Sequence, residues 1–379
     1  MAIKIPFNKP YVSGLEYEYT RQAYENGHLA CDGPFSKKCE SWLESRAGCH
    51  KAILTSSCTV ALELAAILAD IKPGDEIIMP SFTFVSTANA FVLRGGVPVF
   101  VDIRPDTLNL DEKKIEAAIT PKTKAIVPMH YGGVPCEMDT MMAIAKKHEL
   151  LVIEDAAQGI LSHDHGRPLG SIGHLGVFSF HETKNIICGE GGALLINNPR
   201  FVERAEMVSR KGTDRSRFLS GQVDKYTWRD IGSSYRLSEL AAAFLFGQME
   251  NADRIISERL EIWKRYYDFF CKSKLSGQFN LPLSFSKTSL NGHLFYLLLD
   301  NQQSRPSFLK YLNKRGVGAI FHYAPLHDSE AGMKFGRVHG TLDVTDGVSK
   351  KLVRLPLWIG LDSQAAKYIC EMVQSFFNA

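Results

Sequence analysis

The chain has 379 residues, a formal net charge of +3, 45% hydrophobic residues and 22% charged residues, which is typical of a soluble globular protein with room for two domains. The near-neutral charge argues against nucleic acid or an anionic membrane as a partner. Because the sequence shows no run of about 18 apolar residues and no apolar signal core, we expect a cytoplasmic protein.

Short apolar runs alternate with amphipathic segments through the first 250 residues. The expected strands are 52–54, 76–79, 97–101, 125–129, 150–154, 176–180 and 193–196, and the expected helices are 59–69, 86–93, 111–119 and 138–148. Apolar runs bounded by turns, with helices between them, predict a buried parallel sheet wrapped by helices. We therefore assign residues 1–250 to an α/β sheet domain with an N-terminal arm.

The pattern changes near Asn251. A long, charged amphipathic helix is expected over 255–272, followed by an apolar strand at 293–299 and helices at 306–315 and 363–377. This mixture predicts a smaller α+β domain over residues 251–379. Since no low-complexity linker separates the two parts, we expect them to pack firmly together.

The cysteines are scattered along the chain and include no Cys-x-x-Cys pair. They stand at positions 31, 39, 49, 58, 136, 188, 271 and 370. Metal and disulfide frameworks need clustered ligands or an oxidising compartment. We therefore expect reduced, mostly buried thiols and no metal centre.

The segment from Phe178 to Gly192 carries a single lysine between two apolar runs. Its sequence is Phe-Ser-Phe-His-Glu-Thr-Lys184-Asn-Ile-Ile-Cys-Gly-Glu-Gly-Gly. This order predicts a strand, a polar turn and a glycine-rich turn before the next strand. A lysine held between two buried strands is suited to deprotonate and form a Schiff base. The alternative is a solvated lysine on a surface hairpin, and this segment alone does not decide between the two.

Small hydroxyl residues lie between an expected strand and a helix start, in Leu54-Thr-Ser-Ser57-Cys-Thr59-Val. Backbone N–H groups at a helix N-terminus, together with such hydroxyls, are suited to bind a phosphate. The segment is not the lysine-bearing glycine-rich loop of nucleotide hydrolases. Simple N-capping by serine or threonine explains the same pattern.

Asp155 stands at the carboxyl end of an expected strand, in Val-Ile-Glu-Asp155-Ala-Ala-Gln158. Ligands of open α/β sheets collect at this edge, and a buried carboxylate requires a cationic partner. A protonated pyridine nitrogen is one such partner, and the pairing makes the ring an electron sink. An aspartate that caps a following helix is the alternative.

Two further segments give weaker signals. In Pro80-Ser-Phe-Thr-Phe84, an aromatic residue after a strand end could stack on a planar ring or belong to the core. The polar segment Trp228-Arg229-Asp-Ile-Gly-Ser-Ser234-Tyr-Arg236 precedes an apolar helix and suits anion recognition. Its alternative is a capping segment in which Ser238 begins the helix.

Taken in this order, these segments resemble the DegT/DnrJ/EryC1/StrS family of pyridoxal-phosphate-dependent sugar aminotransferases. The similarity covers essentially the whole chain. Its markers are Pro80-Ser-Phe-Thr-Phe, Glu154-Asp-Ala-Ala-Gln, Phe178-Ser-Phe-His-x-x-Lys with Gly-Glu-Gly-Gly, Arg236-Leu-Ser-Glu-Leu, and His322-Tyr-x-Pro-Leu-His327. It implies the fold-type-I α/β architecture, with a mainly parallel seven-stranded sheet and a smaller C-terminal α+β domain. It also implies a homodimer with shared active sites.

The resemblance further implies a role for each matching residue. Lys184 would form the Schiff base with pyridoxal 5'-phosphate and move protons, and Asp155 would pair with the ring nitrogen. Gln158 would lie near the ring hydroxyl, and Phe84 would stack on the ring. The phosphate would be held by Ser57, Cys58, Thr59 and Ser179, and by the loop around Ser234 of a second subunit, where the family usually has asparagine.

The implied reaction transfers an amino group from glutamate to C4 of a dTDP-linked 4-keto-6-deoxy sugar. Amination at C3, or of a UDP-linked sugar, stays open. Candidates for binding the sugar nucleotide are His322, Tyr323, His327 and Arg229. Family members that act as sugar dehydratases carry histidine at the lysine position, so Lys184 favours transamination. A non-catalytic scaffold is hard to reconcile with the joint presence of Lys184, Asp155 and Gln158.

Overall fold

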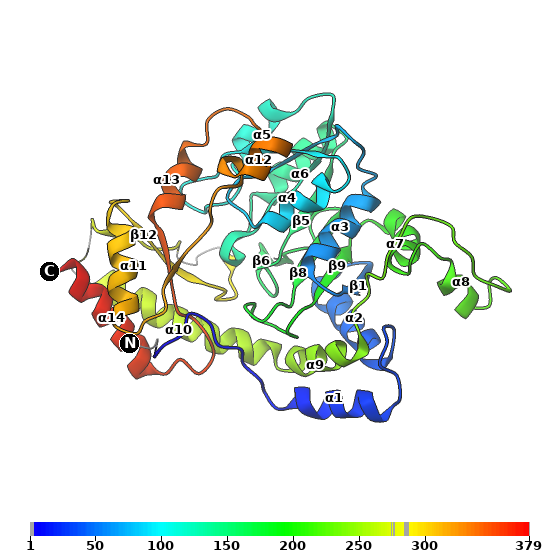
Figure 1. Cartoon of the computed structure of the whole chain (residues 1–379), viewed down its shortest axis with the longest axis horizontal. Coiled ribbons are helices and arrows are strands. Elements are labelled where there is room, and N and C mark those ends of the chain that lie inside the picture. The colour runs from blue at the N-terminus through cyan, green and yellow to red at the C-terminus, as the bar shows by residue number, and fades with distance from the viewer. Residues whose placement is uncertain (1–3, 274, 276, 284–287, 379) are drawn as a thin grey trace.

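The computed structural model of the protein describes residues 4–273, 275, 277–283 and 288–378, so the first three residues of the expected N-terminal arm lie outside it. Helices surround a central sheet, and a second sheet stands beside it in the C-terminal part, which begins with α10 (Figure 1). The first described residues lie against this C-terminal part, where Ile5 forms a backbone bridge with Val317.

An eight-stranded sheet forms the centre of the fold, in the order β1-β9-β8-β5-β4-β2-β3-β14. Strand β9 is antiparallel to β1 and β8, and every other neighbouring pair is parallel. The seven expected strands are all present, and the two-residue β14 adds an eighth from the C-terminal part. The bounds are β1 (Lys51–Thr55), β2 (Glu76–Pro80), β3 (Val97–Val101), β4 (Thr123–Ile126), β5 (Leu151–Asp155), β8 (Leu175–Ser179), β9 (Gly192–Ile196) and β14 (Arg337–Val338).

The central strands are buried on both faces, which explains their continuous apolar sequences. Successive side chains point to opposite faces of a strand. Ile153 therefore packs in the cluster with α3, α4 and α7, whereas Val152 packs in the cluster with α5 and α6. Near β1 and β9, a third cluster includes α2 and α9. The bounds are α2 (Pro34–Ala47), α3 (Cys58–Leu68), α4 (Val85–Val92), α5 (Glu112–Ala118), α6 (Met138–Lys147), α7 (Val202–Ser209) and α9 (Glu239–Glu250).

The C-terminal part has its own sheet and its own apolar core. The sheet order is β10-β12-β15-β13, and α10, α11 and α14 pack with it in one cluster. The bounds are α10 (Ala252–Lys272), β10 (Phe279–Asn280), β12 (Phe295–Leu299), α11 (Ser304–Lys314), β13 (Ile320–Phe321), β15 (Leu352–Leu355) and α14 (Ser363–Phe377). Among the described residues, no helix combines the length and hydropathy that crossing a bilayer requires.

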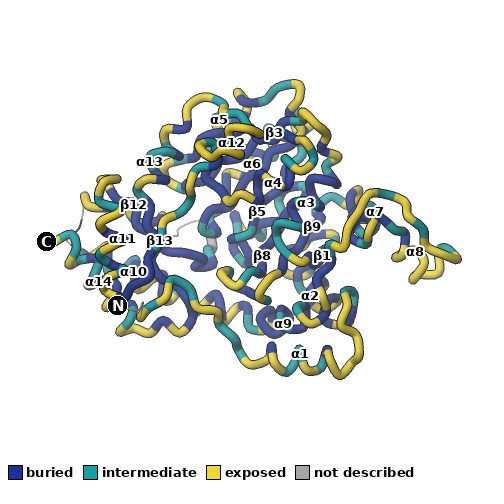
Figure 2. The backbone as a smooth tube through the Cα atoms, in the orientation of Figure 1, coloured by how far each residue is buried: buried dark blue, intermediate teal, exposed yellow. Residues whose placement is uncertain are grey.

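The remaining elements are short or peripheral. A small sheet has the order β11-β6-β7. Its bounds, and those of the other elements, are α1 (Leu15–Glu25), η1 (Tyr131–Gly133), β6 (His163–Asp164), β7 (Arg167–Pro168), η2 (Pro199–Phe201), α8 (Arg215–Leu219), β11 (Thr288–Ser289), η3 (Leu326–Asp328), α12 (Glu330–Phe335) and α13 (Asp343–Lys351). Residues 214–231, here called the α8 arm, project from the body at the right of Figure 1. Figure 2 shows that much of this arm is exposed.

Both edges of the central sheet are covered. Along β1, the N–H groups of Ala52 and Leu54 donate to the carboxylates of Glu44 and Glu40 on α2, each at 3.2 Å. Along β3, the opposite edge is covered by β14, whose Arg337 forms a two-point ion pair with Glu76 of β2 at 2.8 Å. The C-terminal part is therefore joined to the sheet edge as well as packed beside it.

Candidate active site

Lys184 lies on the connection between β8 and β9, beyond the carboxyl end of β8. The N–H of Phe180 donates to Gly191 O and the N–H of Cys188 donates to Phe180 O, both at 2.8 Å, so strand pairing continues into the connection. The N–H of Lys184 closes a turn by donating to His181 O at 2.9 Å. The Lys184 side chain is half-buried and borders a cavity of about 480 Å³.

The environment of Lys184 favours a neutral amine. Burial lowers the pKa of Lys184 because the charged form loses its hydration, and the nearby Arg354 guanidinium lowers it further, against the opposing charges of Cys58 and Asp155. An amine with a lowered pKa is available as a nucleophile and proton acceptor at lower pH. This environment does not fit the alternative interpretation of Lys184 as a solvated lysine on a surface hairpin.

Asp155 ends β5 and faces the same cavity. Its backbone N–H donates to Pro128 O at 2.8 Å. One carboxylate oxygen accepts the N–H of Ala157 at 3.2 Å, and the other accepts the hydroxyl of Thr87 at 2.6 Å. The residues after Asp155 form a turn and not a helix, so the helix-cap alternative is wrong. The carboxylate is buried, fixed by two donors and able to accept a cation from the cavity.

The N-terminus of α3 lies at another wall of the cavity. Ser57 caps this helix by accepting the N–H of Val60 at 3.2 Å, so the capping interpretation is confirmed for Ser57. The N–H groups of the first turn have no acceptor within a helix, which suits them to an anion. Strand β9 begins directly against this turn, because a side chain at Gly192 would overlap backbone atoms of Ser57 and Cys58. Glycine at this position therefore permits the close approach.

Three more predicted residues border the cavity. The Gln158 side chain is fixed at both ends, because its oxygen accepts the N–H of Gly132 at 2.6 Å and its nitrogen donates to the Tyr323 hydroxyl at 2.9 Å. Phe84 precedes α4 and is 57% exposed, so one face of its ring is free to stack on a planar group. Ser179 ends β8 beside the same space.

The C-terminal part supplies His322 and Tyr323 to the opposite side of the cavity. The His322 Nδ1 lies 3.1 Å from the Tyr131 hydroxyl. Burial lowers the pKa of His322 well below its ordinary value, assisted by the charges of Arg354 and Lys184. His322 is therefore neutral at physiological pH and presents a polar ring to a bound molecule.

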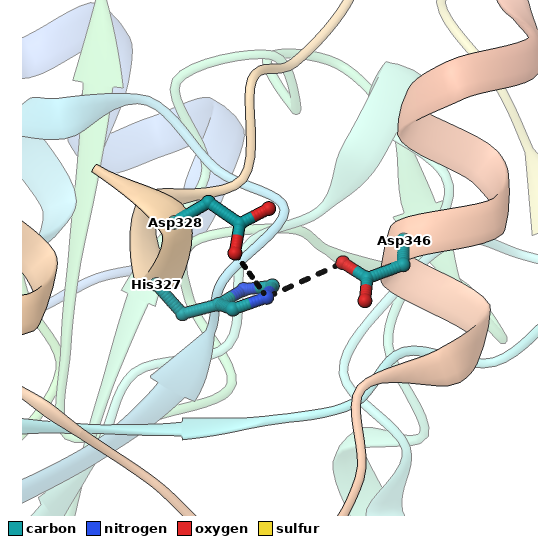
Figure 3. Close-up of side chains that lie close together, drawn as sticks. All are labelled: His327, Asp328 and Asp346. Carbon is teal, nitrogen blue, oxygen red and sulfur yellow. Dashed lines mark ion pairs between the residues drawn. The ribbon is translucent and has the colours of Figure 1, made fainter.

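His327 lies outside the residues that line this cavity. Its Nδ1 lies 2.7 Å from the Ser81 hydroxyl, and its Nε2 lies 3.3 Å from Asp328 and 3.2 Å from Asp346 of α13 (Figure 3). One ligand atom from each of His327, Asp328 and Asp346 falls within 4.8 Å of the others. Because protein groups already engage both ring nitrogens, His327 is a polar link between the end of β2 and the C-terminal part. The expected contact of His327 with the sugar stays a prediction, since His327 lies outside the cavity lining of its own chain.

Arg229 and Ser234 also lie away from the cavity of their own chain. Arg229 belongs to the α8 arm and forms an ion pair with Asp214 at 2.7 Å. Ser234 is exposed and forms a backbone bridge with Arg210. Ser238 caps α9, as the sequence predicts, by accepting the N–H of Ala241.

Three basic residues that the sequence did not single out also border the cavity, namely Arg259, His293 and Arg354. Arg259 donates to Gly292 O at 3.1 Å and to His293 O at 2.7 Å, so it holds this part of the backbone. Arg354 interrupts the apolar run Leu-Val-Arg-Leu-Pro-Leu. A charged residue inside a strand that is otherwise apolar was the signal that could have identified it.

These groups fit pyridoxal phosphate, a planar aromatic aldehyde with a phosphate and a basic ring nitrogen. The first turn of α3 can hold the phosphate, Phe84 can stack on the ring, Asp155 can pair with the ring nitrogen, and Lys184 can bond to the aldehyde carbon. All four come from the carboxyl ends of strands β1, β2, β5 and β8 of the central sheet or from the connections that follow them, where such sheets place their ligands.

Comparison with known proteins agrees with this chemistry. The chain is 32% identical to the spore coat polysaccharide biosynthesis protein SpsC of Bacillus subtilis over 98% of this chain and 96% of SpsC. It superimposes on the aminotransferase TlmJ of Streptoalloteichus hindustanus with a TM-score of 0.90, at 27% identity and over 99% and 100% of the two chains. For S. venezuelae DesV, the TM-score is 0.86 at 28% identity, over 96% and 94%. Residues 11–374 match the family model described as the DegT/DnrJ/EryC1/StrS aminotransferase family, and the protein therefore belongs to that family of pyridoxal-phosphate-dependent sugar aminotransferases.

Proposed function

We propose that the protein transfers the amino group of glutamate to C4 of a dTDP-linked 4-keto-6-deoxy sugar, giving dTDP-4-amino-4,6-dideoxygalactose. The observation that carries the reaction type is the half-buried Lys184 amine beside the buried Asp155 carboxylate in one cavity. The choice of substrate rests on residues 81–95 and 221–235, which resemble dTDP-4-amino-4,6-dideoxygalactose transaminase. That resemblance supports a place in enterobacterial common antigen or another surface polysaccharide.

Each cavity residue has a task in this proposal. When bound, pyridoxal phosphate supplies an electron sink for the carbon next to the amine. Lys184 takes and returns the proton at that carbon, because its amine, whose pKa is lowered by burial, is the base that follows β8. Asp155 keeps a positive ring nitrogen in place, and the Thr87 hydroxyl holds the Asp155 carboxylate. Gln158 lies where it can reach the ring hydroxyl.

The size of the cavity supports two substrates that enter in turn. A volume of about 480 Å³ is within the range of ligand sites that hold molecules larger than a single amino acid. Glutamate would bind first and leave as its keto acid, and the nucleotide sugar would follow in a ping-pong sequence. His322 and Tyr323 are proposed for the sugar side, since both border the cavity from the C-terminal part.

We further propose a homodimer with shared active sites. The α8 arm carries the exposed apolar residues Phe218, Leu219, Tyr226, Trp228 and Ile231, and Trp228 is 80% exposed. Such apolar exposure in one segment favours a protein partner. In a dimer, Ser234 and Arg229 could reach the cavity of the other chain, although they lie away from their own.

Mixed dimers test this arrangement. Lys184→Ala and Ser234→Trp are each expected to be inactive alone and to complement each other when co-refolded. Random mixing gives about half mixed dimers with one intact site of two, so about a quarter of wild-type activity should return. If dimers shown by mass to be mixed recover no activity, each site is built from one chain.

The substrate proposal is tested by the product. The purified protein is incubated with glutamate and a panel of dTDP- and UDP-linked keto sugars, and NMR identifies the aminated carbon. A C4 amine on the dTDP sugar supports the proposal, whereas a C3 amine or a UDP product supports the alternative substrates. Loss of a sugar hydroxyl without amination would indicate a dehydratase, and absence of cofactor absorbance would indicate a scaffold.

A cytoplasmic location is proposed on the state of the cysteines. All eight carry free thiols in the structure. Most are buried or half-buried, as at Cys39 and Cys58, and only Cys271 is exposed. Free thiols in this number are typical of a reducing compartment.

A further inference from the structure

Arg354 presents a cation to the cavity without a protein anion. It lies in β15 between the buried residues Val353 and Leu355, and its guanidinium carbon is 4.7 Å from the centre of the Phe7 ring. Its Nε is buried and has no hydrogen-bond partner. In the part of the chain that the structure describes, no carboxylate lies within ion-pair distance of Arg354.

The two arginines that are buried among the described residues, Arg236 and Arg259, have protein partners. Arg236 is paired with Glu40 and Glu206, each at 2.8 Å. Arg259 donates to two backbone carbonyls. Arg354 is half-buried, and its buried Nε has no such partner. An unpaired polar group of this kind is costly, and a guanidinium cannot lower the cost by losing its proton at physiological pH. The placement of Arg354 therefore indicates that an anion from outside the chain pairs with its guanidinium.

We propose that Arg354 binds the α-carboxylate of the amino-acid donor, and of the 2-oxo acid that the donor becomes. This inference rests on the proposed function and identifies a residue that selects its first substrate. Arginine is suited to the role because its planar fork of N–H donors matches a carboxylate.

Both substrates carry anionic groups, and the position of Arg354 relative to Lys184 favours the α-carboxylate of the amino acid over the diphosphate of the sugar nucleotide. Arg354 and Lys184 border the same cavity, and the charge of Arg354 contributes to the lowered pKa of Lys184. In an amino acid, the α-carboxylate is attached to the same carbon as the reacting amine. In a sugar nucleotide that reacts at C4, the diphosphate lies across the sugar ring from the reacting carbon. The α-carboxylate is therefore the anion that lies close to Lys184 in every productive complex.

The same contacts explain how one site accepts a charged and a neutral reacting group in turn. Phe7 stacks under the guanidinium and stabilises it by a cation–π interaction when a sugar ring replaces the amino acid. Burial lowers the pKa of Arg354, and Tyr131 and Tyr323 oppose this shift. The Tyr323 hydroxyl, which borders the cavity, and the neutral His322 can serve either a carboxylate or sugar hydroxyls.

The test compares glutamate with its α-carboxamide, isoglutamine, in the wild type and in Arg354→Met. Stopped-flow absorbance of the bound cofactor measures the amino-acid half-reaction of the holoenzyme without any sugar. We expect the wild type to prefer glutamate by about 10- to 100-fold in apparent affinity, and Arg354→Met to lose that preference. Arg354→Lys should recover part of it, because a positively charged group remains. The half-reaction driven in reverse by the amino-sugar product should change by less than about threefold.

Controls separate this role from a general structural effect. Arg315→Met removes an exposed arginine that stacks on Tyr311, away from the cavity, and should leave the preference intact. Thermal melting gives a readout independent of turnover. Addition of 2-oxoglutarate should raise the melting temperature of the wild type and of Arg315→Met, but not that of Arg354→Met. If Arg354→Met does not fold, Arg354→Lys still tests the contact, because it should show a weaker preference for glutamate over isoglutamine than the wild type does.

Each other result overturns the inference. Retained preference for glutamate over isoglutamine in a folded Arg354→Met excludes the α-carboxylate contact. Loss of discrimination against glutamine instead would assign Arg354 to the side-chain carboxylate, and loss confined to the sugar half-reaction would assign it to the diphosphate. The proposed function fails separately, if glutamate converts the cofactor with the expected preference but no keto sugar is aminated.

Discussion

Thr87→Val tests whether the Asp155 carboxylate has to be held by a hydrogen bond. The Thr87 hydroxyl donates to Asp155 at 2.6 Å, and the Thr83 hydroxyl lies 2.8 Å from that of Thr87. Since a carboxylate only accepts, the Thr87 proton points to Asp155, and Thr83 must donate to Thr87. Valine keeps the shape of threonine and removes this donor.

The expected magnitude follows from the charge on the acceptor. A hydrogen bond to a charged group contributes about 1.5–3 kcal/mol, and a neutral bond such as Thr83–Thr87 contributes about 0.5–1.5 kcal/mol. If Asp155 acts through the position of its charge, Thr87→Val should slow the glutamate half-reaction by about 10- to 100-fold. Thr83→Val should slow it by less than about tenfold.

The assay is single-turnover absorbance of the bound cofactor at saturating glutamate, with melting curves to confirm that each variant is folded. Thr87→Ser restores the hydroxyl and should react at close to the wild-type rate. The reasoning is refuted if folded Thr87→Val reacts within about twofold of the wild type. That result would mean that the Ala157 N–H and the end of β5 hold the carboxylate without help.

The remaining predictions concern Lys184 and Asp155 directly. Lys184→Ala should leave the fold intact and slow the half-reaction by several orders of magnitude, and near-wild-type conversion of the cofactor would exclude Lys184 as the proton carrier. Asp155→Asn should still bind the cofactor but remove the proton far more slowly, whereas an unchanged kcat would leave Asp155 only a role in the local turn. Burial lowers the pKa of Lys184 in the folded state, so the Lys184 amine binds a proton more readily in the unfolded apoprotein. Lys184 therefore reduces the free energy of unfolding at neutral pH, and this reduction fades as the pH rises towards the unfolded pKa. In urea unfolding between about pH 7 and about pH 10, the wild type should gain stability relative to Lys184→Met, and parallel curves would contradict this.

The sequence predicts those parts of the site that depend on local chain order. Lys184 and Asp155 follow short apolar runs that the sequence predicts as strands, and the carboxyl ends of parallel strands meet at one sheet edge. Ser57 follows the same logic at a helix start. These placements depend on few distant contacts, so strand pattern and turn chemistry indicate them, and the family resemblance favours one of the alternatives that the pattern leaves open.

Other parts depend on tertiary packing and could not be predicted. Arg354 reaches the cavity only because β15 pairs with β12 and β13 beside the central sheet. His327 belongs to a marker segment with His322, yet a few residues of chain carry it from the cavity to Ser81 and Asp346. Ser234 is exposed on its own chain, so its contacts are not determined by one chain at all.

The covered edges of the central sheet have a consequence for how the chain is made. An open strand edge is a template for pairing with another molecule, and β3 has such an edge until β14 is available. On a ribosome, Arg337 emerges long after Val101, and at usual translation rates the interval is roughly ten seconds or more. During that time the nascent sheet can recruit a wrong strand, whereas β1 is already shielded by the carboxylates of α2, which precede it. The order of elements along the chain thus concentrates the risk of aggregation at one edge and ends it only when the C-terminal part has been synthesised.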